Sequence, residues 1–425
     1  MSIASDLAQE LVDAIVDFLH NDRATLLSSS LVARKWVPAT RHHLFERIAI
    51  HQFRHRGPRR FRDTASSFIA LCSSPFCGIV PSIQDVVLNV DSDFHPAPGI
   101  QALVAVLARA PVRKIVFIDH TSAPAQPSSL SWLSLHFPGL REFAYSALGR
   151  FIPDVFTLVA SLPELRSLAL YSGSKESAKR AISQAMPYPA LFHTVFAHLR
   201  TLRLRLYAPQ ADEFLGWLLT LGDHLRVETL DLTVFHCYHN GWGPVAALNS
   251  FFCAQGRHLR HLRIQIRYED SDGDLDEDAR LSEDSAGDLD FSPLTNLQSL
   301  LLNSHNVDAV CTALASLPSR MPSLTSLEVD FKEWIYWDDF PCDCNPSIMV
   351  YDFAGVMSED QFAQLTEFVI RVPEFFGDRG REALKDYFPR WDNTDVVSVL
   401  FVEQDTFQVD SAESVWDSMF GSMDE

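Results

Sequence analysis

The chain of 425 residues has little of what marks a membrane-inserted or secreted protein. No apolar run approaches the ~18 residues that a membrane span needs, and no membrane partner is expected. The first residues carry no basic segment ahead of their apolar positions, so we expect no signal peptide. The seven cysteines follow no regular spacing, and the single N-x-S match, at Asn345, contains a proline. These features favour the cytoplasm or the nucleus.

Positive charge is also scarce. The 35 Lys and Arg residues stand against 55 Asp and Glu residues, which gives a net charge of −20. Because such a surface repels phosphate backbones, nucleic acid is not an expected partner. Seven of the arginines fall within residues 41–62. That segment is either a nucleic-acid or nuclear-import patch, or a solvated junction that leads into a helix over 61–73.

Motifs that would carry catalysis or hold a metal are missing as well. The sequence has no G-x-S-x-G, H-E-x-x-H, P-loop or G-x-G-x-x-G pattern, and one S-x-x-K match at Ser172 lacks its companion motifs. Cys342 and Cys344 have no histidine or second cysteine pair nearby. We therefore expect no enzyme, no catalytic residue, no metal ligand and no cofactor. A hydrolase on an α/β fold would need a pocket with perturbed carboxylates or a perturbed cysteine.

What the sequence does have is a repeated apolar pattern, L-x-x-L-x-L. Clear and weaker copies recur about every 31 residues. They begin at Ile83, Val112, Leu140, Leu165, Leu199, Val227, Leu259, Leu297, Leu324, Leu365 and Val396. Each copy ends in apolar–polar alternation, which predicts a strand with one buried face. Helix-like stretches such as 100–109, 214–219 and 310–317 lie between copies, and prolines often follow them.

This pattern resembles the leucine-rich repeat family in its longer, helix-containing form, and predicts an α/β solenoid. Its parallel strands would line the concave face and its helices the convex face. An ordinary α/β domain of βαβ units is the alternative. The repeats depart from the family because the Asn or Cys expected after the strand is mostly missing.

The first fifty residues lack the repeat pattern and are predicted to form a separate helical unit. An amphipathic helix is predicted over 6–19, with Asp6 as N-cap and Gln9 completing a capping box. A second apolar stretch runs from Thr25 to Trp36, and Pro38 opens a third short helix. A unit this small cannot bury much by itself, so apolar surface left over indicates a partner or a docked neighbour.

Two segments of this unit resemble an F-box. They are Leu7-Ala8-Gln9-Glu10-Leu11 and Leu31-Val32-Ala33-Arg34-Lys35-Trp36. The family pattern has proline where Ala8 stands and cysteine where Ala33 stands. The whole chain is similar to F-box proteins with degenerate leucine-rich repeats, a type abundant in fungi.

The resemblance implies that the first unit docks on a Skp-type adaptor and, through it, on a cullin. The implied adaptor-binding residues are Leu7, Glu10, Leu11, Ile15, Leu31, Val32 and Trp36. The alternative is that these side chains only hold the three helices together. Both roles stay open for Ile15 and Trp36, whereas Leu7 and Leu11 are expected at the interface.

The predicted domains are an F-box-like helical domain (1–48), a solenoid (49–405) and an acidic C-terminal tail (406–425). Residues 269–290 interrupt the solenoid with eleven acidic residues and one arginine. We expect this acidic insertion to be mobile, since such charge density disfavours packing.

The client of such a protein would bind the concave face, which the strand residues between the leucines form. The client-binding residues predicted on this basis are Tyr171, Arg203, Arg205, Asp231, Arg263 and Arg267. The four arginines suit an acidic or phosphorylated client, because a guanidinium group offers forked donors. Alternatively, each arginine pairs with a neighbouring acid.

Together these features predict a substrate-recognition adaptor of an SCF-type ubiquitin ligase. A protein-interaction scaffold that uses the same solenoid without a ligase is the alternative.

Overall fold

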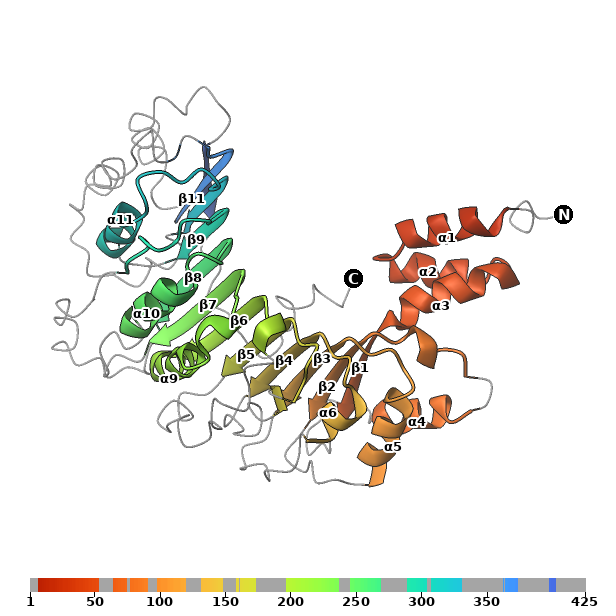
Figure 1. Ribbon diagram of the computed structural model, residues 1–425. Coiled ribbons are helices and arrows are strands. Elements are labelled where there is room, and N and C mark those ends of the chain that lie inside the picture. The colour runs from red at the N-terminus through yellow and green to blue at the C-terminus, as the bar shows by residue number, and fades with distance from the viewer. Residues whose placement is uncertain are drawn as a thin grey trace, which may run out of the picture. The chain divides into compact units, whose positions relative to one another are not determined.

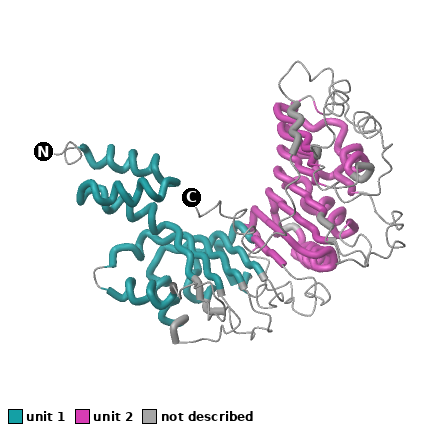
Figure 2. Tube along the Cα trace, turned by 180° about the vertical axis from the view of Figure 1, so that it is seen from behind, with its two compact units in different colours: residues 1–168 teal, residues 169–425 magenta. Residues whose placement is uncertain are grey.

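The structure is a computed structural model, and it divides into two compact units, residues 1–168 and 169–425 (Figure 2). It describes residues 7–52, 64–74, 77–90, 98–119, 131–147, 158–159, 161–172, 196–236, 245–268, 289–303, 307–330, 362, 364–373 and 397–402. The N-terminal helices and the first repeats belong to the same compact unit, and the predicted domain boundary near residue 48 stays a prediction. The predicted C-terminal tail and most of the acidic insertion lie outside the described residues.

Three short helices open the first unit, as predicted. They are α1 (Gln9–Phe18), α2 (Arg23–Ser29) and α3 (Val37–Glu46), with a 3-10 turn at Arg34–Trp36 between α2 and α3. Asp22 begins α2 by accepting hydrogen bonds from the backbone N–H and the hydroxyl of Thr25. These bonds lower the pKa of Asp22. Pro38 lies in the first turn of α3, where its missing N–H costs nothing.

The start of α1 differs from the prediction. Its N-cap is Ala8, whose side chain accepts no capping bond, and Asp6 lies outside the described residues. The Gln9 amide donates instead to the Asp13 carboxylate at 2.7 Å and to the Lys35 carbonyl at 3.3 Å. Gln9 therefore joins α1 to the turn before α3 rather than completing a capping box.

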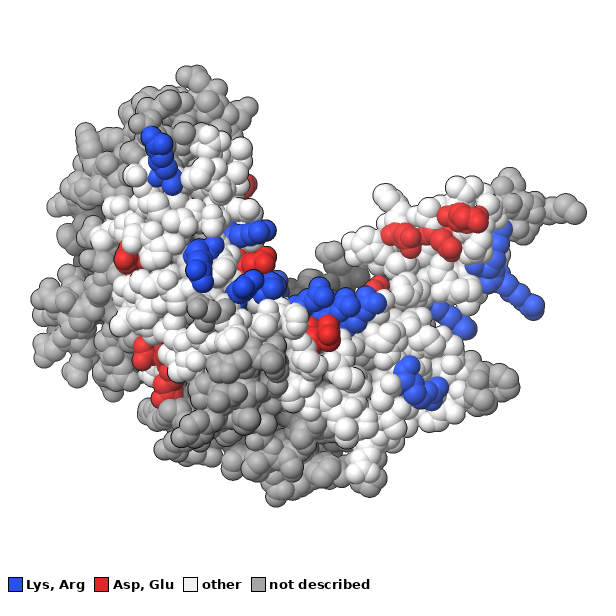
Figure 3. Space-filling view, viewed as in Figure 1, with Lys and Arg blue, Asp and Glu red and all other residues white. Residues whose placement is uncertain are grey.

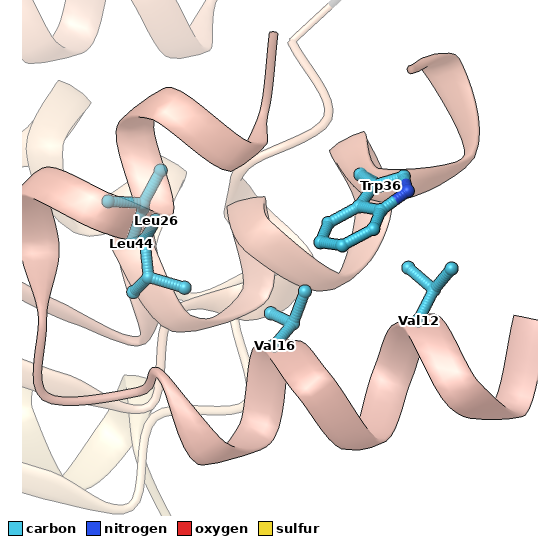
Figure 4. Packing of buried hydrophobic residues seen from close by; sticks show 5 residues of the cluster. All are labelled: Val12, Val16, Leu26, Trp36 and Leu44. Carbon is cyan, nitrogen blue, oxygen red and sulfur yellow. The ribbon is translucent and has the colours of Figure 1, made fainter. Parts of the chain in front are cut away.

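The core of these helices lies on a side of α1 that the sequence pattern did not identify. Val12 and Val16 are fully buried and point toward Leu26, Trp36 and Leu44 (Figure 4). The sequence pattern predicts an apolar stripe at i, i+4, i+8, i+11 and i+12, which are Leu7, Leu11, Ile15, Phe18 and Leu19. In the structure this stripe packs only through its end residues Leu7 and Leu19, which are half-buried. The helix thus has two apolar sides, of which one is open to solvent.

The rest of the first unit consists of parallel strands with helices beside them (Figure 1). The strands are β1 (Arg47–Gln52), β2 (Asp85–Val90), β3 (Lys114–Asp119) and β4 (Glu142–Ala147). Each strand pairs in parallel with the next one along the chain. The helices between them are α4 (Thr64–Cys72), α5 (Pro98–Leu107) and α6 (Ser131–His136). The strand β1 was not predicted, and it replaces part of the expected arginine-rich junction; Arg54, Arg56, Arg59, Arg60 and Arg62 lie outside the described residues.

The second unit continues the same arrangement. Its strands are β5 (Ser167–Ser172), β6 (Thr201–Tyr207), β7 (Thr229–His236), β8 (His261–Tyr268), β9 (Ser299–Asn303), β10 (Ser326–Asp330), β11 (Glu367–Pro373) and β12 (Val397–Val402). From β6 onward each strand pairs in parallel with its successor. The described helices α9 (Ala208–Leu219), α10 (Val245–Gln255) and α11 (Val307–Ala315) lie on one side of the sheet (Figure 1).

The repeat pattern located these strands. Each of the eleven predicted starts is followed within two residues by a strand, from β2 to β12. The fold is therefore an α/β fold with a parallel sheet whose strands pair in chain order within each unit. That order fits the predicted solenoid, because the strand order of a doubly wound sheet reverses at a switch point.

The leucines of the repeats are buried on the helix side of the sheet. In β6, Leu202, Leu204 and Leu206 are fully buried, and Arg203 between them is exposed. Each buried leucine stabilises the fold by about 1.5–3 kcal/mol relative to an exposed one. The L-x-x-L-x-L pattern thus sorts apolar and polar side chains to opposite faces.

The end of the predicted acidic insertion is packed. Residues 269–288 lie outside the described residues, but Asp290 donates its backbone N–H to the Asn249 side chain at 2.9 Å. The Leu289 carbonyl accepts from the Ser316 hydroxyl, and Phe291 is fully buried. The insertion therefore ends before Leu289, not after Asp290 as predicted. Within the described part of the chain, no helix is both long and apolar enough to cross a membrane.

Gly256, at the end of α10, provides a test of the repeat packing. A Cβ atom there would lie 2.5 Å from the Phe252 carbonyl oxygen and 2.6 Å from that of Pro293. We expect Gly256→Ala to lower the free energy of unfolding by about 1–3 kcal/mol, because two backbone segments must move apart. Urea unfolding followed by far-UV circular dichroism measures the change.

Gly216 provides the matched control, since a Cβ atom there meets nothing within 4 Å. Gly216→Ala lies inside α9 and should stabilise by up to about 1 kcal/mol. Equal midpoints for Gly256→Ala and the wild type would contradict the close approach.

Candidate functional site

Exposed apolar side chains gather on the N-terminal helices. Eight large hydrophobic side chains are exposed among the described residues, and six of them fall between residues 11 and 32. These six are Leu11, Ile15, Phe18, Leu27, Leu31 and Val32. We call them the apolar surface. Leu31 is 86% exposed and Phe18 is 87% exposed. A group of large apolar side chains that is open to water in this way marks an interaction site.

The predicted adaptor-binding residues divide between this surface and the core. Leu11, Ile15, Leu31 and Val32 belong to the apolar surface, and Glu10 is also exposed. Leu7 is half-buried against the core. Trp36 is 8% exposed and packs between α1 and α3. Of the two roles that the sequence left open for it, the structure therefore shows the one in the core.

Two members of the apolar surface, Phe18 and Leu27, were not predicted as site residues. Helical periodicity places Phe18 on the same stripe of α1 as Leu11 and Ile15, but the resemblance to an F-box did not include it among the adaptor-binding residues. Leu27 could not be assigned, because the adjacent Leu26 is buried and nothing in the sequence orients α2.

Hydrogen bonds tie together the two segments that resemble an F-box. The Lys35 ammonium group donates to the Leu7 carbonyl, and the Gln9 amide donates to the Lys35 carbonyl. The segments at 7–11 and 31–36 are therefore neighbours in space as well as parts of one pattern.

A second surface lies on the sheet of the second unit, on the face away from the described helices. It contains Tyr171, Arg203, Arg205, Asp231 and Arg263 from β5 to β8, and we call it the polar strand face. Strand register places Asp231 between Arg203 and Arg263. Figure 3 shows basic and acidic side chains along the strands. The structure thus brings together five of the six predicted client-binding residues; the side chain of Arg267 lies outside the described ones.

An arginine covers the one aromatic ring of this face. The Arg205 guanidinium carbon lies 5.6 Å from the centre of the Tyr171 ring, within the range of a cation–π contact. Burial raises the pKa of Tyr171, and the neighbouring Arg205 and Arg203 oppose that shift. The tyrosine is only 6% exposed, so it supports Arg205 and offers little surface of its own to a client.

Arg263 lies beside an acidic residue, as in the alternative in which each arginine pairs with a neighbouring acid. Its Nε lies 3.9 Å from the Asp231 carboxylate. The Gln265 amide, oriented with its oxygen toward Arg263, accepts from Arg263 Nη2 at 2.8 Å and donates to the Thr233 hydroxyl at 3.2 Å. Arg203 is exposed and has no ion pair in the described part of the chain. The face therefore carries three arginines against one acid.

The perturbed titratable groups do not form a catalytic arrangement. Burial raises the pKa of Asp85 and of Asp212, which lie in different units. Burial, with Cys77 beside it, raises the pKa of the Cys72 thiol to about 12. A nucleophilic cysteine needs a lowered pKa, so Cys72 is perturbed in the wrong direction. Among the described residues, no three His, Cys, Asp or Glu side chains are placed to hold a metal ion.

Comparisons with known proteins find similarity among solved structures. No family model and no curated protein matches the sequence. Among solved structures, the chain is similar to one in the crystal structure of the Rad7 and Elc1 complex in yeast, with 13% sequence identity. The similarity covers 96% of this chain and 94% of that chain, with a TM-score of 0.35. This score is too low to support an argument about fold or function.

The position of Trp36 can be tested directly. Its indole N–H is buried and finds no hydrogen-bond partner in the described structure. We expect Trp36→Phe to leave the helices stable, because the ring stays packed and an unsatisfied donor disappears. Trp36→Ala should destabilise them by about 3–5 kcal/mol. Hydrogen–deuterium exchange of residues 9–18 reports the local effect, and equal protection in both variants would show that Trp36 lies outside the core.

Proposed function

We propose that the protein is a substrate-recognition adaptor of an SCF-type ubiquitin ligase. In this proposal the apolar surface docks on a Skp-type adaptor, which links the chain to a cullin, and the repeats capture a client protein. The partners perform the chemistry, and this chain is not an enzyme. The observation that carries the proposal is the concentration of exposed apolar side chains between residues 11 and 32, on and between the two segments that resemble an F-box. A cytoplasmic or nuclear location follows from these partners.

The two departures from the F-box pattern are compatible with docking. Ala8 has a φ of −60°, close to the value that proline would impose, so its backbone already has the usual conformation. Ala33 packs against the core formed by Val12, Val16 and Trp36. A cysteine there would also act as a small apolar side chain. Neither substitution alters the apolar surface itself.

The same geometry suits a non-ligase scaffold, in which the apolar surface holds some other protein. Adaptor binding separates the two proposals.

Substitutions on the apolar surface test adaptor docking. We expect Leu11→Asp and Leu31→Asp each to weaken binding to a purified fungal Skp-type adaptor at least tenfold, because docking would bury an unpaired charge. Both side chains are exposed, so the variants should fold. Isothermal titration calorimetry measures the affinity, and circular dichroism checks the fold.

Leu135→Asp serves as the matched control, since Leu135 is 77% exposed on α6 and does not belong to the apolar surface. It should bind the adaptor like the wild type. Unchanged affinity in Leu31→Asp would remove the ligase proposal and leave the scaffold.

The polar strand face is the proposed site for an acidic or phosphorylated client segment. Arg203 supplies an exposed cation and Arg205 a second positive charge held over Tyr171, while Asp231 limits what Arg263 can contribute. The Arg203→Glu/Arg263→Glu double variant should bind a fluorescent peptide with glutamate at alternate positions about tenfold more weakly than the wild type at low salt. Added salt should reduce the difference.

Fluorescence anisotropy measures this binding. The Arg226→Glu/Arg257→Glu double variant is the control, because it changes the net charge by the same amount at two exposed residues outside the strands. An equal loss of affinity in both double variants would mean that net charge, rather than the polar strand face, attracts the peptide.

A further inference from the structure

A row of arginines marks the starts of β3, β4 and β5. Arg113, Arg141 and Arg166 each immediately precede a strand, and all three are exposed. We call them the arginine ladder. The Arg141 backbone N–H donates to the Arg113 carbonyl at 2.8 Å, and the Arg166 N–H donates to the Arg141 carbonyl at the same distance. Successive strands therefore hold the three residues side by side at a fixed spacing.

The acids that begin β2 and β4 lie beside basic residues of the neighbouring strands. The first residues of the strands alternate in charge, with Arg47 beside Asp85, Asp85 beside Lys114, and Lys114 beside Glu142. The Lys114 ammonium group lies 3.6 Å from the Glu142 carboxylate. This row balances its own charge. The exposed Glu164, two residues before Arg166, forms no ion pair in the described part of the chain. In the described part of the chain, none of the three ladder guanidinium groups forms a hydrogen bond or an ion pair.

The equivalent position in the second unit shows an arginine with a structural role. Arg200 precedes β6, and its Nε lies 3.3 Å from the carboxylate of Glu228, the next residue in the row. Its Nη1 also donates to the carbonyls of Ala197 and Leu199. The Arg200 guanidinium group is thus bonded within the protein, whereas those of the ladder arginines are not.

We propose that the arginine ladder binds a doubly phosphorylated segment of a partner protein. Neighbouring strands lie about 4.8 Å apart, so the ladder spans roughly 10 Å between its outer members. In a peptide in the polyproline II conformation, which has three residues per turn, side chains three residues apart lie on the same side and are separated by roughly 9 Å. Each phosphate can accept two parallel hydrogen bonds from a guanidinium group.

A nucleic acid fits this surface less well. Single strands bind through long basic grooves combined with aromatic side chains on which the bases stack. The ladder has three cations in a chain of net charge −20, which confines the positive potential to a short strip. The exposed large hydrophobic side chains of the described residues include only one aromatic, Phe18, and it belongs to the apolar surface.

The inference is independent of adaptor docking, and the test needs no adaptor. A fluorescent Gly/Ser peptide with two phosphoserines three residues apart is titrated with the full chain at low salt, and anisotropy reports binding. We expect Arg113→Gln/Arg141→Gln/Arg166→Gln to lower the affinity about tenfold and each single variant about two- to threefold. The unphosphorylated peptide should not bind.

The matched control removes the same charge elsewhere. Arg23, Arg34 and Arg41 are exposed on the N-terminal helices, and the Arg23→Gln/Arg34→Gln/Arg41→Gln variant should bind the phosphopeptide within about twofold of the wild type. Circular dichroism confirms that both triple variants fold.

Four results would overturn the proposal. They are the absence of binding to the wild type, equal loss of affinity in the two triple variants, competition by inorganic phosphate as effective as that of unlabelled phosphopeptide, and a loss caused instead by Arg203→Glu/Arg263→Glu. A single-stranded oligonucleotide that binds more tightly than the phosphopeptide, and whose binding the triple ladder variant abolishes, would also contradict the proposal. Such a result would assign the surface to nucleic acid.

Discussion

Backbone hydrogen bonding at the residue before each strand sets the register of the repeats. The carbonyl at this position accepts two N–H groups from the next repeat, as Arg113 does from Arg141 and Glu142 at 2.8 and 3.0 Å. The same bonds recur from Arg200 through Glu228 to Arg260. A slip by one residue would turn every leucine of a strand to the polar face. The burial of the core and the placement of the polar strand face and the arginine ladder therefore depend on this register.

The repeats separate structural from functional positions. The leucines of the strands are buried against the helices, and this burial leaves the residues between them free to vary. In β6 those residues are Arg203 and Arg205, whereas in β10 they are Glu328 and Asp330. Glu328 forms an ion pair with Arg371 of the neighbouring strand. This side of the sheet is therefore basic at β6 and acidic at β10, where Glu328 has a basic partner on β11.

Charge is balanced where arginine and lysine support the fold and is left unbalanced where binding is proposed. Arg200 with Glu228, Lys114 with Glu142 and Arg371 with Glu328 are pairs between neighbouring strands. Exposed pairs of this kind contribute little stability, but they cancel the local field. The ladder arginines keep their field, and in a chain with an excess of acids that field attracts anions only at short range.

The sequence by itself determined the period of the repeats, the strand positions and the three N-terminal helices, because backbone periodicity and helix-stopping residues are local properties. It also identified five residues of the polar strand face, since alternation along a strand fixes which side chains share a side. It failed for β1, which lacks the repeat pattern, and for the buried side of α1.

Only the tertiary structure decided that Val12 and Val16 form the core while Leu11 and Ile15 stay exposed. Both pairs have helical spacing. Which pair is buried depends on where Trp36 and Leu44 pack, and these two residues lie far from α1 along the chain. The arginine ladder was likewise hidden in sequence. Its members are separated by a full repeat each, and they become neighbours only when the strands stack in register.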